Sequence, residues 1–138
     1  MMVIDASVWG AAYMPADVHH TPSRHFIRRV VSRGDQLIAP VLLPVEVAAA
    51  ISRGAGQPER ARRIVRTMLR LAMLRLYAVD STLALRLVRM TYTVRLRGSD
   101  AVYAALAEAL AVPLVSWDNE HLTHASRRIT VYTPTAAS

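Results

Sequence analysis

The sequence predicts an α/β domain with three layers, in which helices cover both faces of a mainly parallel sheet of four to five short strands. Three observations predict this class. Short apolar runs alternate with longer helical segments, 53% of the residues are hydrophobic, and no repeat or linker divides the 138 residues. A chain of this length can bury a substantial core as one domain. We expect the domain to span residues 1–134 and residues 135–138 to be a disordered tail.

The N-terminal third contains two short apolar runs, each followed by helical segments. Thr21 and Pro22 suit an N-cap and a first helical position, while glycines end the longer helices. The elements expected here are a strand at 2–4, a helix at 7–13, a helix at 21–32, a strand at 37–39 and a helix at 44–53.

The middle of the chain contains the clearest amphipathic helix, predicted at 58–74. Arginines repeat every four residues on its polar side. A short strand at 76–79 is expected to follow it. The apolar side of this helix is expected to consist of Ala61, Ile64, Val65, Met68, Leu69 and Ala72.

The C-terminal half repeats the alternation of helices and strands. Ser81 is a favourable N-cap for the first helix of this half. The elements expected are helices at 81–95 and 99–110, a strand at 114–117, a short helix at 119–124 and a strand at 129–132.

The charge balance favours a polyanionic partner. All 17 basic residues are Arg, against ten acidic residues, and the net charge is +7. Guanidinium groups bind phosphate in a bidentate manner and stack on bases, so a nucleic acid is the expected partner. A GC-rich genome would explain the choice of Arg over Lys, but it would not explain the excess of positive charge.

The sequence also excludes several classes of protein. The chain contains no cysteine, which excludes disulfides and thiolate-bound zinc and agrees with a cytoplasmic location. We find no signal peptide and no apolar run long enough to span a membrane. A P-loop enzyme would need a glycine-rich loop that ends in Lys, and the chain has no Lys.

Four acidic residues adjoin apolar elements, namely Asp5, Glu46, Asp100 and Asp118. Ligands of parallel α/β sheets bind at the carboxyl ends of the strands, where Asp5 and Asp118 should project. The other two acids lie in the first turns of predicted helices. Converging carboxylates repel one another unless a divalent cation neutralises them. The pattern therefore predicts a site for Mg²⁺ or Mn²⁺.

Each of these acids also has a purely structural interpretation. Asp5 could cap the helix that follows it, Asp100 is a favourable helix-start residue, and Asp118 could begin a turn. Glu46 is the hardest to explain in this way, because Val45, Val47 and three alanines flank it. Singly the structural interpretations are preferred; the four acids together favour a metal site.

With these residues in place, the chain resembles PIN-domain ribonucleases, in particular the VapC-type toxins of type II toxin–antitoxin pairs. The resemblance covers nearly the whole length, and the order and spacing of its segments are specific. These segments are residues 3–7, 40–47, 98–107 and 114–122.

The resemblance implies a PIN-like nuclease domain that hydrolyses RNA with Mg²⁺ or Mn²⁺. The four acids would be the catalytic, metal-holding residues, supported by Ser7 and Ser116. Trp117 occupies a position where the family commonly has a smaller residue. The resemblance also implies a cognate VapB-like antitoxin and a homodimer. A catalytically silent PIN-fold module that binds RNA or protein is the alternative.

Other residues have weaker functional interpretations. The stripe of Arg62, Arg66 and Arg70 could follow RNA phosphates, be a solvated helix face, or be covered by an acidic antitoxin segment. His121 is expected at the surface, although its spacing from Asp118 would let it approach the site. Trp117 could stack on a base, but packing near the sheet edge is the preferred interpretation.

Overall fold

Five short parallel strands form one sheet in the order β3-β2-β1-β4-β5. The computed structural model describes the backbone of residues 1–137 and their side chains, except those of residues 54 and 55. The predicted α/β class and its parallel sheet are confirmed. The strands are β1 (Met2–Ile4), β2 (Leu37–Pro40), β3 (Leu74–Tyr77), β4 (Leu114–Val115) and β5 (Val131–Tyr132).

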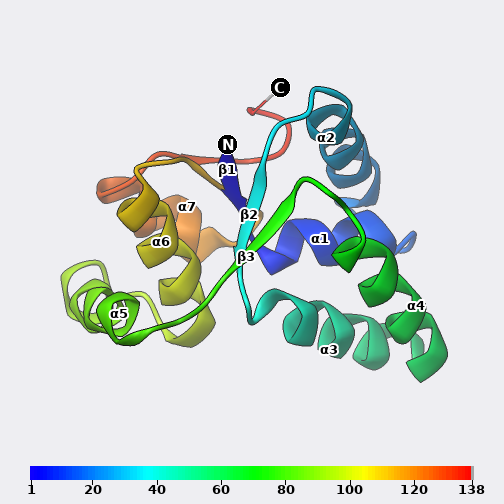
Figure 1. Cartoon of the computed structure of the whole chain (residues 1–138), viewed down its shortest axis with the longest axis horizontal. Helices are drawn as coiled ribbons and strands as arrows, with labels where there is room; N and C mark the ends of the chain where they lie inside the picture. Colours follow the sequence, from blue (N-terminus) through cyan, green and yellow to red (C-terminus); the bar gives the residue numbers. More distant parts are fainter. Residues whose placement is uncertain (138) are drawn as a thin grey trace.

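Helices cover both faces of this sheet, as predicted. Figure 1 shows the sheet with one group of helices, α1 to α4, on its right and another, α5 to α7, on its left. The first group is α1 (Ala6–Tyr13), α2 (His20–Ser32), α3 (Leu43–Ala55) and α4 (Pro58–Leu69). The second group is α5 (Ser81–Thr93), α6 (Gly98–Leu110) and α7 (Asn119–Thr123), which the 3₁₀ turn η1 (Ala125–Arg127) follows.

The strand order reverses beside β1. The chain moves outward from β1 to β2 and β3, then returns to the other side of β1 for β4 and β5. In sheets of this kind, ligands bind at the carboxyl ends of the strands where the order reverses. In this fold that point lies between β1 and β4. Strands β1 and β2 run down the view in Figure 1, so their carboxyl ends lie at the lower edge.

The core is densest where α6 packs on the central strands. Residues 101–107 of α6 are all buried, and Ala104, Ala105 and Ala107 have no exposed surface. Small side chains let a helix lie close to a sheet, so α6 is held firmly against β1, β2 and β4. The helix thereby presents its first turn at the carboxyl ends of the strands.

Helix α4 is shorter than the sequence predicts. It ends at Leu69 instead of residue 74, and Leu69 is 48% exposed. Strand β3 begins at Leu74 instead of residue 76, because its pairing with β2 sets Leu74 opposite Leu37. The chain therefore has to turn between these two elements, within the segment that the apolar pattern had assigned to the helix.

Two predicted caps are wrong. Thr21 lies inside α2, which begins at His20 and has no side-chain cap. The N-cap of α5 is Asp80 rather than Ser81, because the Asp80 carboxylate accepts a hydrogen bond from the Leu83 amide at 2.8 Å. A carboxylate one residue earlier reaches the free amides of the first turn and so displaces Ser81 from this role.

The C-terminal segment makes a turn after β5. The amides of Ala136 and Ala137 both donate to the carbonyl of Thr133 at 3.0 Å. The disordered tail expected at 135–138 includes Ser138, which lies outside the described residues. Within residues 1–137, no helix combines the length and the apolar character that crossing a bilayer would require.

Candidate active site

The four acids come from four separate segments that meet near the point where the strand order reverses. Asp5 directly follows β1 and is the N-cap of α1, while Asp118 follows β4 and is the N-cap of α7. Glu46 and Asp100 lie in the first turns of α3 and α6. The structural interpretation of Asp5 as a helix cap is therefore also correct, whereas Asp118 caps a helix instead of beginning a turn.

Asp5 is the most enclosed of the four acids, with 6% of its surface exposed. Its Oδ2 atom accepts hydrogen bonds from the Ser7 amide at 3.1 Å, from the Ser7 hydroxyl and from the Ser116 hydroxyl at 3.1 Å. The contact between Asp5 and Ser116 follows from the pairing of β1 with β4. Ile4 lies opposite Val115, so Asp5 and Ser116, which come next in the chain, also lie side by side. Three donors on one oxygen fix the position of this carboxylate.

Ser116 connects Asp5 to the rest of the site. Its hydroxyl oxygen accepts from the Asp118 amide at 2.9 Å and lies 2.9 Å from Nδ1 of His121. Ser116 has no exposed surface. Ser7, which is expected near the first acid, lies beside it, and its hydroxyl also accepts from the Trp117 amide at 3.1 Å. Ser116, which is expected as the hydroxyl residue two positions before the last acid, contacts Asp5 as well.

The predicted surface position of His121 is wrong. The imidazole has no exposed surface, although a surface position was expected. Its Nε2 atom lies 2.8 Å from the Asp100 carbonyl oxygen, which can only accept, so Nε2 carries a hydrogen. Its Nδ1 atom lies 4.0 Å from Oδ2 of Asp5. His121 therefore connects α7 to the first turn of α6.

Tyr103 holds Glu46 in a similar way and was not singled out by the sequence. Its hydroxyl donates to Oε2 of Glu46 at 2.5 Å. Burial raises the pKa of the Tyr103 hydroxyl, and the hydrogen bond to Glu46 raises it further. The phenol therefore keeps its proton and acts only as a donor. Tyr103 lies one turn after Asp100 on α6, and this i, i+3 spacing was the available signal.

Asp100 is held differently from the other acids. Burial raises the pKa of its carboxyl, and the negative charges of Asp118, Asp5 and Glu46 raise it further, while His121 lowers it. No hydrogen bond to the Asp100 carboxylate occurs among the described residues. The Asp100 carboxylate therefore experiences the combined repulsion of the other three acids without a donor that offsets it.

The donor set suits a hard divalent cation. Asp5, Glu46 and Asp118 each use one carboxylate oxygen for hydrogen bonds, and within residues 1–137 their second oxygens make none. Such oxygens are the ligands that Mg²⁺ and Mn²⁺ prefer. However, no three acidic or histidine side chains of the described residues already stand close enough to hold an ion. Direct binding of one cation by three of these side chains would therefore require them to move, whereas one or two carboxylates with water are a common way of holding Mg²⁺.

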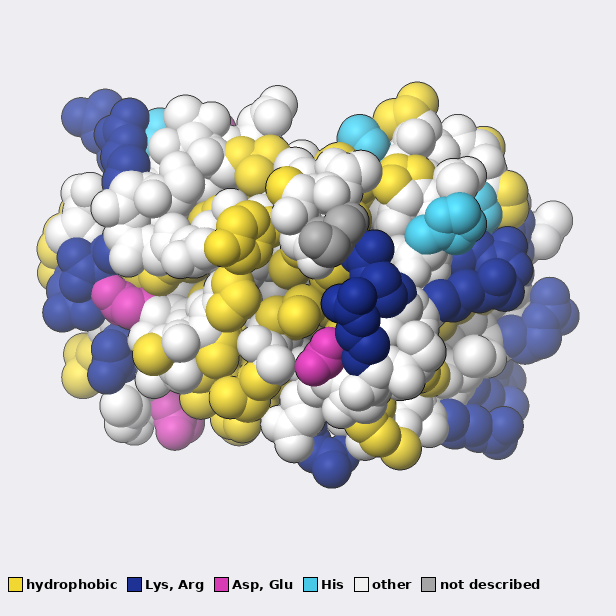
Figure 2. Space-filling model, turned by 90° about the horizontal axis from the view of Figure 1, so that it is seen from above, with side chains coloured by type: hydrophobic (Ala, Val, Ile, Leu, Met, Phe, Trp, Pro, Cys, Tyr) yellow, Lys and Arg dark blue, Asp and Glu magenta, His cyan; other side chains and the backbone are white. Residues whose placement is uncertain are grey.

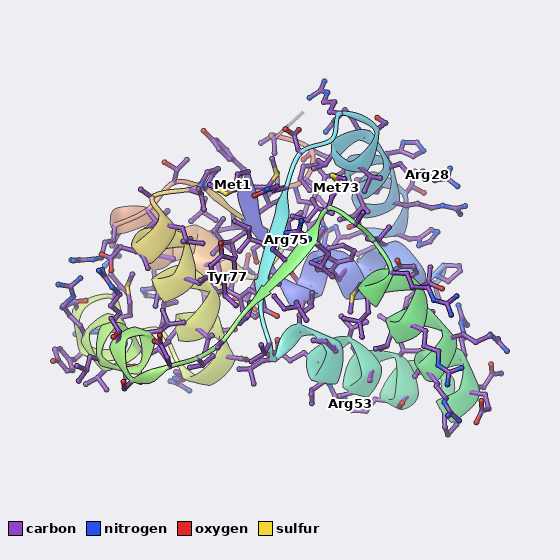
Figure 3. The ribbon with its side chains drawn as sticks, in the orientation of Figure 1. Met1, Arg28, Arg53, Met73, Arg75 and Tyr77 are labelled. Atoms are coloured by element: carbon purple, nitrogen blue, oxygen red, sulfur yellow. The ribbon has the colours of Figure 1, made fainter. Side chains whose placement is uncertain are left out.

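The arginine stripe lies apart from the acids. Arg62, Arg66 and Arg70 are exposed on or just after α4, which packs against α3. Figure 2 shows arginines concentrated at the right-hand end of the molecule, the end that α2 and α4 occupy in Figure 1, with smaller groups at the left. Arg28 on α2 points outward at the same end (Figure 3). This end of the molecule is strongly positive.

Comparison with known proteins gives one family and several similar folds. The model of the PIN domain matches residues 2–127. The structure is similar to that of the VapC20 toxin of Mycobacterium tuberculosis, which is described as cleaving the sarcin-ricin loop, with a TM-score of 0.75, 13% identity, and coverage of 94% of this chain and 97% of that chain. No curated protein sequence is significantly similar to the chain.

Two further solved structures have similar folds. DNA-bound VapBC from Salmonella typhimurium has a TM-score of 0.72, 13% identity, and coverage of 96% of this chain and 97% of that chain. FitAcB from Neisseria gonorrhoeae has a TM-score of 0.74, 12% identity, and coverage of 98% of this chain and 99% of that chain. At sequence identities this low, the similarity shows a shared fold and nothing more.

Proposed function

Because the chain belongs to the PIN domain family, we propose that it is a metal-dependent ribonuclease that hydrolyses RNA phosphodiester bonds with Mg²⁺ or Mn²⁺. The observation that supports this proposal is that four acids follow or begin elements near the carboxyl ends of the central strands, close enough for three of them to act on the fourth. The charges of Asp118, Asp5 and Glu46 all raise the pKa of Asp100. A cluster of like charges at a ligand-binding edge is favoured only when a cation joins it.

The residues of the chain have distinct roles in this proposal. Asp5, Glu46, Asp100 and Asp118 would hold the cation. A bound divalent cation supplies Lewis-acid stabilisation of charge on a phosphoryl oxygen and activates water for in-line attack. Ser7 and Ser116 orient Asp5, and Tyr103 orients Glu46, through the hydrogen bonds described above. We assign no general base among the four acids.

We further propose that the protein is the toxin of a VapBC-type pair, with a cognate VapB-like antitoxin. Support comes from the similar folds of VapBC from Salmonella typhimurium and of FitAcB. A homodimer is part of the same proposal. The apolar side chains of Leu85, Val88 and Tyr92 lie along one side of α5 and are 74%, 54% and 70% exposed, which offers a surface for self-association.

A catalytically silent module that binds RNA or protein is the second candidate. One observation favours it: within the described residues, no three acidic or histidine side chains form a ready cation site. A silent module would bind RNA without cutting it and would not need the four carboxylates. The two candidates thus differ in their requirement for metal.

An RNA cleavage assay separates these candidates. Purified wild-type protein and Asp5→Asn are each incubated with pooled RNA in Mg²⁺, in Mn²⁺ and in EDTA. The proposal predicts cleavage by the wild type alone, abolished by EDTA. Equal cleavage by the Asp5→Asn variant would contradict the role of the four acids, and RNA binding without any cleavage would support the silent module.

A further inference from the structure

A pocket of ≈ 430 Å³ adjoins the acidic site and reaches away from it between α1 and α3. Ser7 and Glu46 line its inner end. Much of the remaining lining consists of small side chains, namely Ala6, Gly10, Ala49 and Ala50. A larger cavity of ≈ 520 Å³ is lined by residues of α1 and α2 together with Leu71, but by none of the four acids. Of these two, the smaller pocket is therefore the one that includes residues of the candidate site, and its volume suits a small planar ligand.

Two stacked aromatic rings also line this pocket. The rings of His19 and Trp117 lie 4.0 Å apart between centroids, with 8° between their planes. Trp117 directly precedes the acid Asp118, and Trp117 and Glu46 both line this pocket. The two rings cover each other's inner faces, so a base would stack on an outer face of the pair, as bases stack on aromatic side chains in proteins that bind single-stranded nucleic acid.

Trp117 is held by two hydrogen bonds, one from its ring and one from its backbone. Its indole Nε1–H donates to the hydroxyl of Ser23 at 2.7 Å, and Ser23 on α2 has no exposed surface. Its backbone amide donates to the Ser7 hydroxyl at 3.1 Å, the same hydroxyl that orients Asp5. A ring held in this way is ready for a ligand, because little side-chain freedom remains to be lost on binding.

A cation lines the same pocket. Arg53 lies near the end of α3, on the lower side of the molecule in Figure 3, and it is exposed. Arg53 follows Glu46 by seven residues on that helix, which places the two on the same side of α3 about two turns apart. The pocket thus combines carboxylates, a stacked aromatic pair and an arginine along its length.

We propose that this pocket is a nucleobase subsite, which receives one unpaired base of single-stranded RNA next to the bond to be cut. Trp117 and His19 form its aromatic wall, and Arg53 contacts a phosphate of the same strand. The inference rests on the proposed ribonuclease function. The base must be unpaired, because a base stacked inside a duplex cannot present its face to the wall.

The test is a cycle that removes the base from the RNA and the aromatic ring from the protein. Wild-type protein in EDTA, where cleavage is prevented, is titrated with fluorescein-labelled oligo(U) and oligo(A). It is also titrated with an abasic strand that keeps the phosphates and lacks the bases. Trp117→Leu is measured in parallel. Its matched control is Tyr77→Leu, which removes a 37% exposed aromatic ring of β3 that does not line the pocket.

The subsite predicts that Trp117→Leu weakens binding of at least one of the two base-containing strands about 5- to 150-fold, the range for losing one base–aromatic stack. Binding of the abasic strand should not change, and Tyr77→Leu should not alter the binding of any of the three strands. Equal effects of Trp117→Leu on base-containing and abasic strands would overturn the proposal, and so would equally tight binding of a duplex.

A second variant protects the test against misfolding of Trp117→Leu, which loses the bond to Ser23. Ala49→Leu fills the pocket from a partly exposed position of α3 and leaves both rings in place. It should also reduce binding of the base-containing strands and spare the abasic strand. If Ala49→Leu folds and keeps the wild-type preference for bases, the subsite is wrong.

Failure of the subsite and failure of the nuclease remain distinguishable. Metal-dependent RNA cleavage by a wild type whose base preference is insensitive to Trp117→Leu and Ala49→Leu would keep the nuclease and overturn the subsite. Base-dependent binding that both variants reduce, in a wild type that cuts no RNA, would support the subsite and point to the silent module.

Discussion

At the scale of single residues, the acids of the site differ in how the protein holds them. Asp5 accepts three hydrogen bonds on one oxygen. Asp100 experiences burial and the charges of the other three acids, and no described residue donates to its carboxylate. The Asp5 carboxylate is therefore held by hydrogen bonds, whereas a negative charge at Asp100 is disfavoured when no cation is present.

The substitutions Asp100→Asn and Asp5→Asn should consequently have opposite effects on stability. Both should abolish RNA cleavage. In EDTA, Asp100→Asn should stabilise the fold because it removes a repelled charge, by less than about 1 kcal/mol since solvent screens this partly exposed group. Asp5→Asn should destabilise the fold by about 1–2 kcal/mol, because an amide oxygen accepts the three hydrogen bonds less strongly than a carboxylate does. Thermal unfolding in EDTA measures both effects, with Asp35→Asn as a control outside the site. Stabilisation by both substitutions would contradict this view of Asp5.

His121 should be needed for activity although it lies behind the acids. His121→Ala removes the imidazole between Ser116 and the Asp100 carbonyl. It should destabilise the fold by about 2–4 kcal/mol, because it leaves a cavity and unpaired polar groups. The kcat for RNA cleavage should fall more than KM rises, because the acids and not the RNA-binding surface are displaced.

The control for this substitution is His25→Ala, since His25 is exposed on α2. Steady-state cleavage kinetics, together with unfolding in urea, would measure both effects. Wild-type kcat in a folded His121→Ala protein would exclude a positioning role for the imidazole.

The sequence predicted the acids of the site better than the residues that hold them. Asp5 and Asp118 stand at strand ends, so the parallel sheet alone predicts that they project at one edge. His121 and Tyr103 lie within helices, and whether such a side chain faces inward depends on how the helix docks. Residue spacing does not specify docking, which explains why His121 was assigned to the surface.

At the scale of elements, the helices on one face of the sheet are linked through a single carboxylate. Glu108 of α6 accepts hydrogen bonds from Arg89 of α5 and from Arg128, which follows η1, and lies 3.8 Å from a nitrogen of Arg86. Burial raises the pKa of Glu108, but Arg128 and Arg89 lower it by more, so that the pKa lies below its ordinary value. These ion pairs hold α5 and the C-terminal segment to α6, the helix that carries Asp100.

The stability of the protein should therefore depend on pH through Glu108. Because its pKa is lowered in the folded state, the contribution is fully present above the ordinary value of 4.5 and is lost as the pH falls through the lowered pKa. Glu108→Gln should cost about 1 kcal/mol at pH 7, a modest value because the arginines are 36–47% exposed.

The difference in the free energy of unfolding between wild type and Glu108→Gln should become smaller below pH 4. Urea unfolding across pH 3–7 measures it, and Glu120→Gln is the control because the Glu120 side chain is 52% exposed. A difference that stays constant across this range would show that the arginines do not act through the charge of Glu108.

The order of the elements was predictable, whereas some of their boundaries were not. Alternating apolar runs and amphipathic segments suffice to predict the order of strands and helices. The end of α4 depends on the pairing of Leu74 with Leu37, two residues that are distant in sequence. Periodicity within a window cannot report such a pairing, so the apolar pattern extended the helix to residue 74.

At the scale of the whole molecule, exposed arginines gather at one end, and Arg53 also lines the pocket that adjoins the acidic site. The net charge is +7, and arginines gather at the end of the molecule that α2 and α4 form (Figure 2). A polyanion that binds this surface would have to extend along the molecule to reach the carboxylates. The arrangement agrees with a substrate strand longer than a single nucleotide.

The arginine stripe on α4 provides a test of this arrangement. The double variant Arg62→Ala and Arg66→Ala should weaken RNA binding more at low salt than at high salt. The slope of log affinity against log salt should fall by about 1.4, or ~0.7 for each lost contact with a single strand. Arg33→Ala combined with Arg127→Ala removes the same charge from other exposed positions. Equal slopes for both double variants would assign the stripe to a solvated helix face.

The most direct test of the metal site is a calorimetric titration of the purified protein with Mn²⁺. Wild type is compared with Asp5→Asn, Glu46→Gln, Asp100→Asn and Asp118→Asn, and with Asp35→Asn as the control. The proposed site predicts saturable binding by the wild type and the control, and binding at least about tenfold weaker in each of the four variants. Wild-type affinity in all four variants would contradict the assignment of these carboxylates to a metal site.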